Sequence, residues 1–385
     1  MKRSTRSRRP TRALNLPWFE GVPYPQFAVW EITYGCNMSC RHCGSNAGGA
    51  RRLRHQELTT DEAFRLCDEL AELGNERITL SGGELFMRKD WDQIAARLQK
   101  NGIGVSLISN GLLVEKNLDR IARLEPLDAL ALSLDGTRQT HDFIRRVPGS
   151  FDRVVAALKA LRRLKVMTAV ITTLSRRNVG ELQRLYDVLV DCQVNGWQLQ
   201  FVIGEGRMEA SADMPAPREI AKVSDFIVAK KRERKMQIMA GDNIGYCRPD
   251  DAEMRGAPWA GCHAGLLVVG IEADGSVKGC LSQQPALQEN NPFVEGNVRD
   301  KSLREIWENP KGFSYNRQFD FAEAKGPCKG CLHLQICRCG CTATAYALHG
   351  SRYENRFCMV ASAKEERRKA KAGALLRMPR PVVPA

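Results

Sequence analysis

The chain has 385 residues, which is long enough for one large domain and a smaller one. No run approaches the roughly 18 consecutive apolar residues of a membrane-spanning helix, and the basic N-terminus lacks the apolar stretch of a secretory signal. We therefore expect a cytoplasmic protein with no membrane partner. In such a chain, fourteen cysteines indicate metal binding or catalysis rather than disulfide bonds.

The formal net charge of +14 is concentrated partly at the two ends of the chain. Six basic residues and no acidic residue lie in the first twelve, and a second basic run lies at 367–371. We interpret residues 1–24 and 363–385 as solvated basic tails. Charge alone gives only non-specific attraction to nucleic acid, and no nucleic-acid-binding motif accompanies it. We therefore expect no specific nucleic-acid partner, whereas an acidic peptide would suit the charge.

Apolar runs and amphipathic stretches alternate along residues 27–203, a pattern typical of β/α units. The first helix is predicted at 60–74. The apolar runs predict six strands, at 27–34, 77–81, 103–109, 128–134, 166–172 and 197–203. Right-handed crossovers would join these strands into a partial (β/α)6 TIM-like barrel with one open side, an α/β fold. We assign residues 25–206 to this barrel, whose open side would admit a large substrate.

Three cysteines follow the first predicted strand. Cys36, Cys40 and Cys43 are separated by three and then two residues. Thiolate sulfur is the soft ligand that iron–sulfur clusters select. One short loop would therefore hold three corners of a four-iron cube and leave the fourth iron open, as catalytic metal sites do. A structural metal loop or buried free thiols are the alternatives.

This spacing, with the aromatic His42 just before the last cysteine, resembles that of the radical S-adenosylmethionine (SAM) enzymes. The resemblance implies that the open iron binds the methionine end of SAM. It also implies that one electron, from a donor such as flavodoxin or ferredoxin, cleaves SAM to methionine and a 5′-deoxyadenosyl radical, which abstracts a hydrogen from an unactivated carbon. The protein then contributes orientation and exclusion of water, while the cofactor carries the difficult chemistry.

Segments at the ends of the next three strands resemble the SAM-binding parts of the same family. Gly82, Gly83 and Glu84 match its Gly-Gly-Glu motif, in which backbone groups and the carboxylate hold the ammonium group of SAM. Arg145 is the candidate clamp for the SAM carboxylate, because arginine binds carboxylates through two hydrogen bonds. Ordinary turn chemistry is the alternative for these segments. The remaining candidate SAM contacts are His42, Ser109, Asn110, Ser133 and Asp135, with Thr173 and Asn178 as further candidates.

A second set of cysteines occupies the last third of the chain, after a basic segment at 207–246 that we interpret as a bridge. Seven of them, with Gly275 between the first two, resemble the SPASM domain, assigned here to residues 247–362. This C-terminal extension of radical SAM enzymes carries auxiliary four-iron clusters and is typical of peptide-modifying members. A zinc site made of four thiolates is the competing interpretation. The seven are Cys262, Cys280, Cys328, Cys331, Cys337, Cys341 and Cys358.

The resemblance implies three four-iron clusters in all, one for SAM and two auxiliary. One auxiliary cluster would be held completely, by Cys328, Cys331, Cys337 and Cys358. The other would take three ligands from Cys262, Cys280 and Cys341. Its fourth ligand is missing from the pattern, and our candidate is Cys247, with Cys339 or an open iron as alternatives. Cys67 and Cys192, in predicted amphipathic helices, are expected in the core.

The auxiliary clusters of this family would remove an electron from the substrate radical or ligate the substrate, which makes the chain an oxidoreductase of peptide maturation. We expect a ribosomal precursor peptide to lose two hydrogens and form a crosslink. Epimerisation, with a thiol such as Cys339 supplying the returning hydrogen, is the close alternative. Only about 25 residues precede the first strand, too few for a winged-helix leader-binding domain. The leader would therefore be bound by the barrel, the bridge or a separate protein.

Other activities remain as alternatives. A sulfatase-maturing enzyme would have an aspartate where this chain has Leu281. An enzyme of a tetrapyrrole or quinone-cofactor pathway is the enzymatic alternative. A non-catalytic electron carrier or zinc-stabilised binding module is the alternative from another class, and Glu84 in its Gly-Gly-Glu setting argues against it.

Overall fold

The computed structural model describes residues 24–47, 49–208, 213–286 and 291–363. The basic runs at the two ends of the chain lie outside these residues. Within the described part of the chain, no helix combines the length and the apolar character that crossing a membrane would require.

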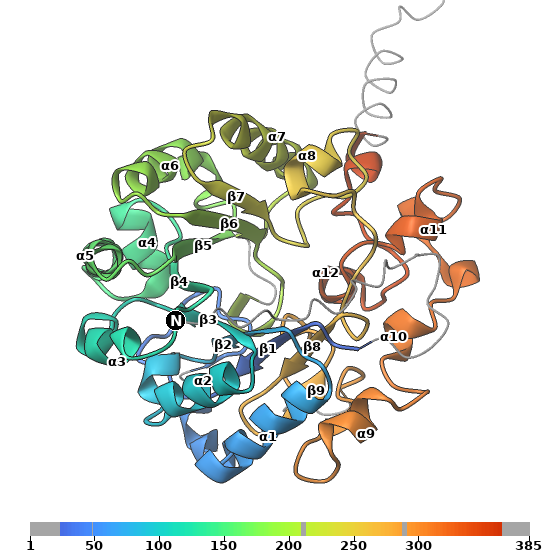
Figure 1. The fold of residues 1–385 in the computed structure, drawn as a ribbon. Helices are drawn as coiled ribbons and strands as arrows, with labels where there is room; N and C mark the ends of the chain where they lie inside the picture. Colours follow the sequence, from blue (N-terminus) through green and yellow to red (C-terminus); the bar gives the residue numbers. More distant parts are fainter. Residues whose placement is uncertain (1–23, 48, 209–212, 287–290, 364–385) are drawn as a thin grey trace, which may run out of the picture.

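A single ten-stranded sheet forms the centre of the molecule, in the order β10-β9-β8-β1-β2-β3-β4-β5-β6-β7 (Figure 1). Strands β8 and β1 to β7 run parallel, and β9 and β10 are antiparallel additions at one edge. The six strands predicted from the sequence are present, with ends that differ by up to three residues. They are β1 (Phe27–Glu31), β2 (Arg77–Ser81), β3 (Gly104–Ser109), β4 (Ala129–Ser133), β5 (Thr168–Leu174) and β6 (Gly196–Phe201).

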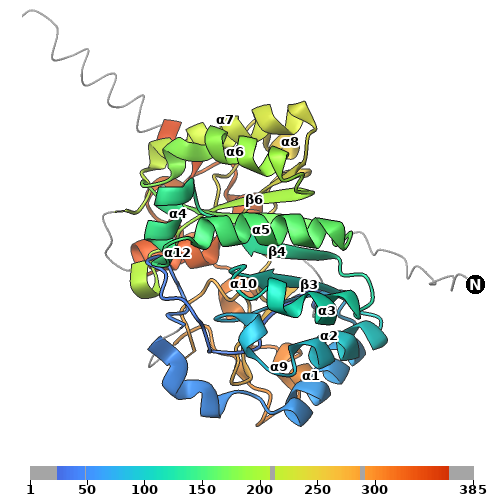
Figure 2. The same cartoon turned by 90° about the vertical axis from the view of Figure 1, so that its left-hand side faces the viewer.

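Amphipathic helices cover the outer face of this sheet (Figure 1, Figure 2). Helix α1 begins at a capping box, in which Thr59 Oγ1 accepts a hydrogen bond from the Glu62 amide and the Glu62 carboxylate accepts one from the Thr59 amide. Its buried side chains include Cys67, and Cys192 is buried after α6, as expected for both. The helices are α1 (Thr60–Glu72), α2 (Trp91–Lys100), α3 (Leu118–Ala122), α4 (Arg138–Arg145), α5 (Ser150–Arg163) and α6 (Leu182–Asp191).

The inner face of the sheet carries polar as well as apolar side chains. In β1, Ala28 and Trp30 are buried in the core, whereas the alternate residues Val29 and Glu31 stay partly accessible. Alternate residues of a strand point to opposite faces, so Glu31 points into the barrel. The same inner positions in other strands carry Thr79, Ser81, Thr173, Gln198 and Gln200. The barrel interior is therefore lined by side chains that can hydrogen-bond a substrate.

The sheet extends beyond the six strands expected from the sequence. The segment interpreted as a bridge contains α7 (Pro217–Glu233) and then β7 (Gln237–Ala240), which pairs with β6. From the cysteine-rich third, β8 (Val268–Ile271) pairs with β1, with Ile271 opposite Trp30. The barrel and the cysteine-rich part thus share one sheet. The remaining elements of that part are α8 (Asp251–Arg255), β9 (Ser276–Lys278), β10 (Gly296–Asn297), α9 (Leu303–Trp307), α10 (Ser314–Arg317), α11 (Leu334–Cys337) and α12 (Thr342–His349).

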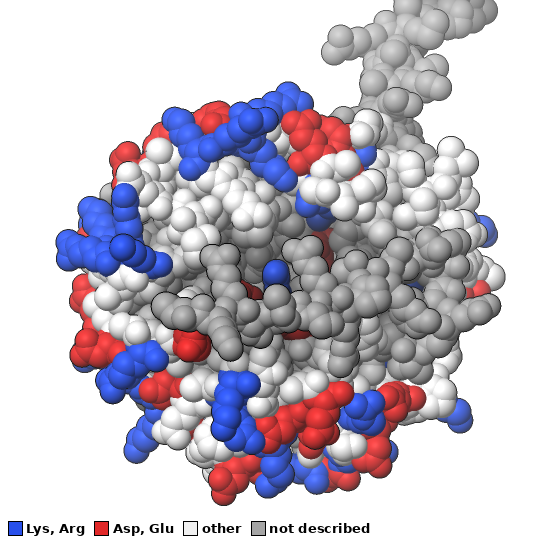
Figure 3. All heavy atoms as spheres, in the orientation of Figure 1, with Lys and Arg blue, Asp and Glu red and all other residues white. Residues whose placement is uncertain are grey.

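Surface charge is mixed on the face shown in Figure 3, where basic and acidic side chains alternate around the rim. At the top and at the left of this view, basic side chains gather into separate groups.

Candidate active site and cysteine groups

The cysteine loop lies at the carboxyl end of β1, where α/β barrels carry their chemistry. Its three thiols pack into one small apolar cluster with Met38, Leu112 and Val147. Arg207, beyond β6, fastens the loop: its Nε donates to the Cys40 carbonyl at 2.6 Å and its amide donates to the Cys43 carbonyl at 3.1 Å. Because these bonds fix the backbone, the loop presents three thiols together, as a cluster with three protein ligands requires.

Gly82 and Gly83 lie directly against this loop. Their close approach is enforced by two backbone hydrogen bonds, from the Gly83 amide to the Thr33 carbonyl and from the Glu84 amide to the Gly35 carbonyl, both 2.8 Å. A side-chain carbon at Gly83 would lie 2.4 Å from the Gly35 oxygen, which no real contact allows. The glycines therefore let the loop after β2 pack on the cysteine loop. The sequence had suggested only that they let the backbone come close to SAM.

Glu84 is fully buried beside the same loop. Its carboxylate accepts hydrogen bonds from Ser109 Oγ and the Asn110 amide, both at 2.8 Å, and from the Phe86 amide at 3.3 Å. Burial raises the pKa of Glu84 to about 7, although these three donors partly offset the shift. An ionised carboxylate offers about four acceptor positions, so one remains for an ammonium group. The structure thus brings together Glu84, Ser109 and Asn110.

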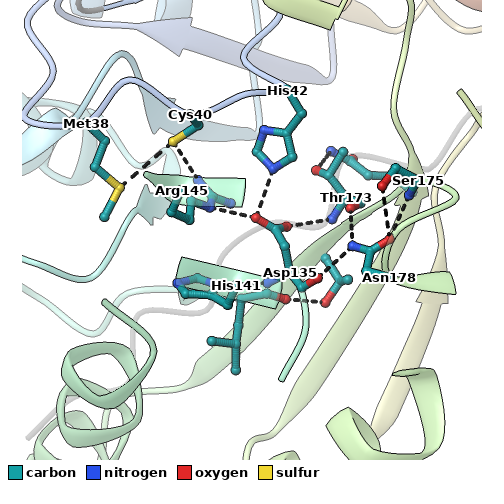
Figure 4. A network of polar contacts seen from close by, with 12 residues as sticks. Met38, Cys40, His42, Asp135, His141, Arg145, Thr173, Ser175 and Asn178 are labelled. Atoms are coloured by element: carbon teal, nitrogen blue, oxygen red, sulfur yellow. Dashed lines mark hydrogen bonds and ion pairs between the residues drawn. The ribbon is translucent and has the colours of Figure 1, made fainter. Parts of the chain in front are cut away.

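Asp135, just after β4, is the centre of a buried polar network (Figure 4). Its Oδ2 lies 2.8 Å from His42 Nε2 and 2.6 Å from Arg145 Nε, and its Oδ1 accepts from the Thr173 amide. Burial alone would raise the pKa of Asp135, but the charges of Arg145 and His42 hold it well below its usual range. Asp135 therefore stays ionised and fixes the His42 ring at the edge of the cysteine loop.

The other candidate SAM contacts are placed differently. Arg145 is buried, with Nε on Asp135 and Nη1 3.7 Å from Cys40 Sγ. Two of its three nitrogens therefore serve the network, and its role as a clamp for the SAM carboxylate stays a prediction. Asn178 donates to the backbone carbonyls of Asp135 and Thr173 at 2.6 and 2.8 Å, which makes it part of the support. Ser133 is half-buried on the inner face of β4 and remains in reach of the barrel interior.

Sequence reasoning missed a charged group on the inner wall of the barrel. Lys278 Nζ lies 2.6 Å from Glu272 Oε1, and both side chains are buried. Glu31 stands beside Glu272, because β1 and β8 are paired in parallel with Trp30 opposite Ile271. Burial and the neighbouring Glu272 raise the pKa of Glu31 to about 7, although Lys278 and a hydrogen bond from Ser45 lower it. The sequence signal that could have predicted this charged group is an acidic residue at the end of each of two apolar runs, namely Glu31 and Glu272.

The cysteines of the last third form two groups. Cys262, Cys280 and Cys341 lie near one another, since the charge of each of the first two acts on the pKa of Cys341. The other group lines a small cavity. It contains Cys247, Cys328, Cys331, Cys337, Cys339 and Cys358. The structure thus places Cys247 and Cys339 in the group around the cavity. The sequence had suggested them as ligands for the group of Cys262, Cys280 and Cys341.

Each of these thiol groups offers the soft sulfur ligands that iron–sulfur clusters select. Among the described residues, no three His, Cys, Asp or Glu side chains converge closely enough to hold one metal ion. Thiolates around a four-iron cube lie farther apart than the ligands of one ion, because each binds a different iron. The sulfur groups available as cluster ligands are the three thiols of the loop, the three near Cys341 and the six around the cavity.

Comparisons with known proteins agree with this arrangement. A sequence model of the radical SAM superfamily matches residues 30–189, and one of an iron–sulfur cluster-binding domain, SPASM, matches residues 262–332. A Methanosarcina barkeri protein named AdoMet-dependent heme synthase is 31% identical over 89% of this chain and 98% of its own length. Mycofactocin maturase MftC of Mycobacterium ulcerans is 29% identical over 85% of each chain. The crystal structure of Streptococcus suis SuiB bound to precursor peptide SuiA shares the fold, with a TM-score of 0.69 and 15% identity over 87% of this chain and 76% of that one.

Proposed function

Because the chain belongs to the radical SAM superfamily and carries a C-terminal SPASM domain, we propose that it oxidises a ribosomally made precursor peptide at an unactivated carbon. The simplest product is a crosslink formed by loss of two hydrogens. A flavodoxin or ferredoxin would supply the reducing electron, and a separate protein would bind the peptide leader. Epimerisation of the peptide is the alternative outcome.

Bound SAM and its cluster supply a radical that removes a hydrogen atom from the substrate, and the auxiliary clusters supply a one-electron acceptor. Cys36, Cys40 and Cys43 would hold the first cluster. Glu84 would bind the ammonium group of SAM through its remaining acceptor position. The polar inner face of β5 and β6 would hydrogen-bond the substrate, and the network around Asp135 would keep the cysteine loop in place.

The charge of the barrel wall is the observation that favours a peptide. Glu272 is neutralised by Lys278, whereas Glu31 forms no ion pair with any described residue. Asp274 adds a further negative charge that acts on Glu31, so the wall is net negative when Glu31 is ionised. A tetrapyrrole with several carboxylates would be repelled by this wall, whereas a neutral or cationic peptide segment would not. The acidic peptide that the net charge of the whole chain suggested is therefore not favoured at the wall.

Glu31 also suits the handling of the proton that must leave the substrate. Loss of two hydrogens amounts to one hydrogen atom, one electron and one proton. With its pKa raised to about 7, the Glu31 carboxylate is close to the ideal strength for a general base near neutral pH. We assign to its carboxylate oxygens the role of accepting this proton and passing it to water.

The relatives support two substrate classes. The similarity to mycofactocin maturase supports a peptide. The similarity to a heme synthase, over nearly all of that relative, favours modification of a tetrapyrrole as the second candidate function.

Anaerobic co-expression with any short peptide encoded beside the gene tests the proposal, with mass spectrometry of the peptide in light and heavy water. A crosslink lowers the peptide mass by two hydrogens in both solvents, whereas epimerisation leaves the mass unchanged in light water and adds deuterium in heavy water. A purified-enzyme arm supplied with iron coproporphyrin III serves as the comparison. An unchanged peptide in both solvents, together with turnover of the porphyrin, would replace the peptide proposal by the second candidate.

A further inference from the structure

An exposed aromatic side chain lies beside the cysteine loop, on the outer side of α4. Phe143 is 41% exposed, whereas His141 and Arg145 on the same helix are buried and bind Asp135 (Figure 4). Residues two positions apart point to nearly opposite sides of a helix. Phe143 therefore faces away from the buried network and presents its ring to solvent.

Two guanidinium groups cover this ring. The guanidinium carbon of Arg41 lies 4.0 Å from the centre of the Phe143 ring, and that of Arg177 lies 4.4 Å from it. Arg41 is held in place because its Nε donates to the Phe143 carbonyl at 3.2 Å and its amide donates to the Ile144 carbonyl at 2.9 Å. Arg177 is held by two hydrogen bonds to Asp213, both 3.1 Å. Single exposed apolar side chains are common on protein surfaces, but this ring is fixed by cations from two distant parts of the chain.

The charge around the ring is mostly positive. Arg146 directly follows α4 and Arg176 precedes Arg177, and both are exposed. Arg41, Arg146 and Arg176 form no ion pair with any described residue, and Asp213 is the only described carboxylate that pairs with this group. Arginine and aromatic side chains are the residues that most often dominate protein–protein interfaces. We name this group the arginine patch, and its members are Arg41, Phe143, Arg146, Arg176 and Arg177.

We propose that the arginine patch docks the acidic electron-donor protein, of the flavodoxin or ferredoxin type, that reduces the cluster of the cysteine loop. Arg41 directly follows Cys40 in the chain, so a protein seated on the patch lies against the loop that would carry the cluster. Electron transfer slows steeply with distance, and the donor must therefore dock close to the group that it reduces. Opposite charge on the donor would speed its association and orient it on the patch.

The position of the patch favours a donor over the substrate. A substrate must reach the barrel interior, whereas Phe143 points to the outside of α4. In the proposed step the donor loses one electron and the loop cluster gains it, with no proton transferred. This inference rests on the reductive cleavage of SAM and does not depend on which substrate is oxidised.

A comparison of two reductants tests the proposal. The reconstituted holoenzyme is given SAM with either reduced flavodoxin or dithionite, and 5′-deoxyadenosine is measured. Dithionite is a small reductant that needs no docking surface. Arg177→Glu and Phe143→Ala should each raise the KM for flavodoxin about 10-fold, with the dithionite-driven rate unchanged. Raised salt should increase the wild-type KM for flavodoxin, and should do so less in Arg177→Glu.

The matched control is Arg163→Glu, an exposed arginine at the end of α5, next to the start of β5 and so at the opposite end of the barrel from the cysteine loop. It should change neither rate. The electron paramagnetic resonance signal of the loop cluster, and its change on adding SAM, report whether the variants keep the site intact. Should Phe143→Ala not accumulate, Arg177→Glu decides alone.

Three results would overturn the proposal, and they can be told apart. A wild-type KM for flavodoxin in Arg177→Glu would show that the donor docks elsewhere. An equal fall of the dithionite-driven rate would show a structural role for the patch. Loss of peptide modification under dithionite, with the KM for flavodoxin unchanged, would assign the patch to the substrate. Failure of SAM cleavage in the wild type with both reductants would instead contradict the radical chemistry on which the proposal rests.

Discussion

His42 Nε2 lies 2.8 Å from Asp135 Oδ2, and this contact joins the cysteine loop to the end of β4 across 93 positions of sequence. The same carboxylate oxygen binds Arg145 at 2.6 Å, and all of Asp135 is buried. One aspartate therefore balances a buried guanidinium and orients the ring nearest the cluster ligands.

Replacing this aspartate should destabilise the barrel. Asp135→Asn leaves the buried Arg145 without its counter-charge, and breaking a buried ion pair costs about 3 to 5 kcal/mol. We expect a clearly lower midpoint for urea unfolding and weaker retention of the loop cluster. Asp187→Asn, at an exposed position on α6, is the control and should change neither. Equal stability of the two variants would remove Asp135 from its supporting role.

Binding of SAM should depend on the ionisation of Glu84. Because its pKa is raised to about 7 by burial, the carboxylate becomes protonated as the pH falls through about 7 and loses its attraction for an ammonium group. We expect SAM affinity to fall over that range in the wild type. Glu84→Gln should bind SAM about 10-fold to 100-fold more weakly, without this pH dependence. Equilibrium dialysis measures both, with the exposed Glu115→Gln as control; a Glu84→Gln variant that keeps the wild-type profile would contradict the assignment.

The contact between the two glycines and the cysteine loop gives a steric prediction. Gly83→Ala places a carbon 2.4 Å from the Gly35 oxygen, so the loop must shift, at a cost of about 1 to 3 kcal/mol. We expect loss of the loop cluster and of SAM cleavage. Gly180→Ala, where a side-chain carbon would meet nothing within 4 Å, is the matched control. Iron content and 5′-deoxyadenosine formation distinguish the two, and an intact loop cluster in Gly83→Ala would show that the contact is not required.

Replacing Glu31 should separate SAM cleavage from product formation. Glu31→Gln keeps the shape of the side chain but accepts no proton, so we expect 5′-deoxyadenosine to form while peptide oxidation falls roughly 100-fold. In the wild type, product formation should rise with pH through about 7, because the carboxylate form increases as the pH passes the raised pKa. The charges that act on Glu31, those of Glu272, Asp274 and Lys278, remain in the variant. Unchanged product formation in Glu31→Gln would assign the proton to another group.

Much of the barrel could be predicted from the sequence, because each of its six strands is a local apolar run between helices with one apolar face. Strand β7 was missed because it lies directly after a strongly basic helix, in a segment read as a bridge. Strand β8 was not predicted because its pairing with β1 joins residues more than 200 positions apart. Local patterns carry no information on such pairings.

In the candidate site, too, some residues could be placed from the sequence and others could not. Glu84, Ser109 and Asn110 follow successive parallel strands, so their meeting at one edge follows from the order of strands. The placement of Cys247 on the six-thiol cavity depends on a left-handed backbone and on packing around Tyr246. Neither is visible in cysteine spacing, which had suggested the other group.

Hydrogen transfer from the peptide to SAM tests the central claim most directly. The purified enzyme is given the encoded peptide with deuterium at its carbon-bound positions, together with reductant and SAM, and the 5′-deoxyadenosine is examined by mass spectrometry. We predict one deuterium in the 5′-deoxyadenosine for each peptide that loses two hydrogens, and no 5′-deoxyadenosine with Cys40→Ala. Formation of unlabelled 5′-deoxyadenosine with an unaltered peptide would contradict the claim that this chain oxidises a peptide carbon.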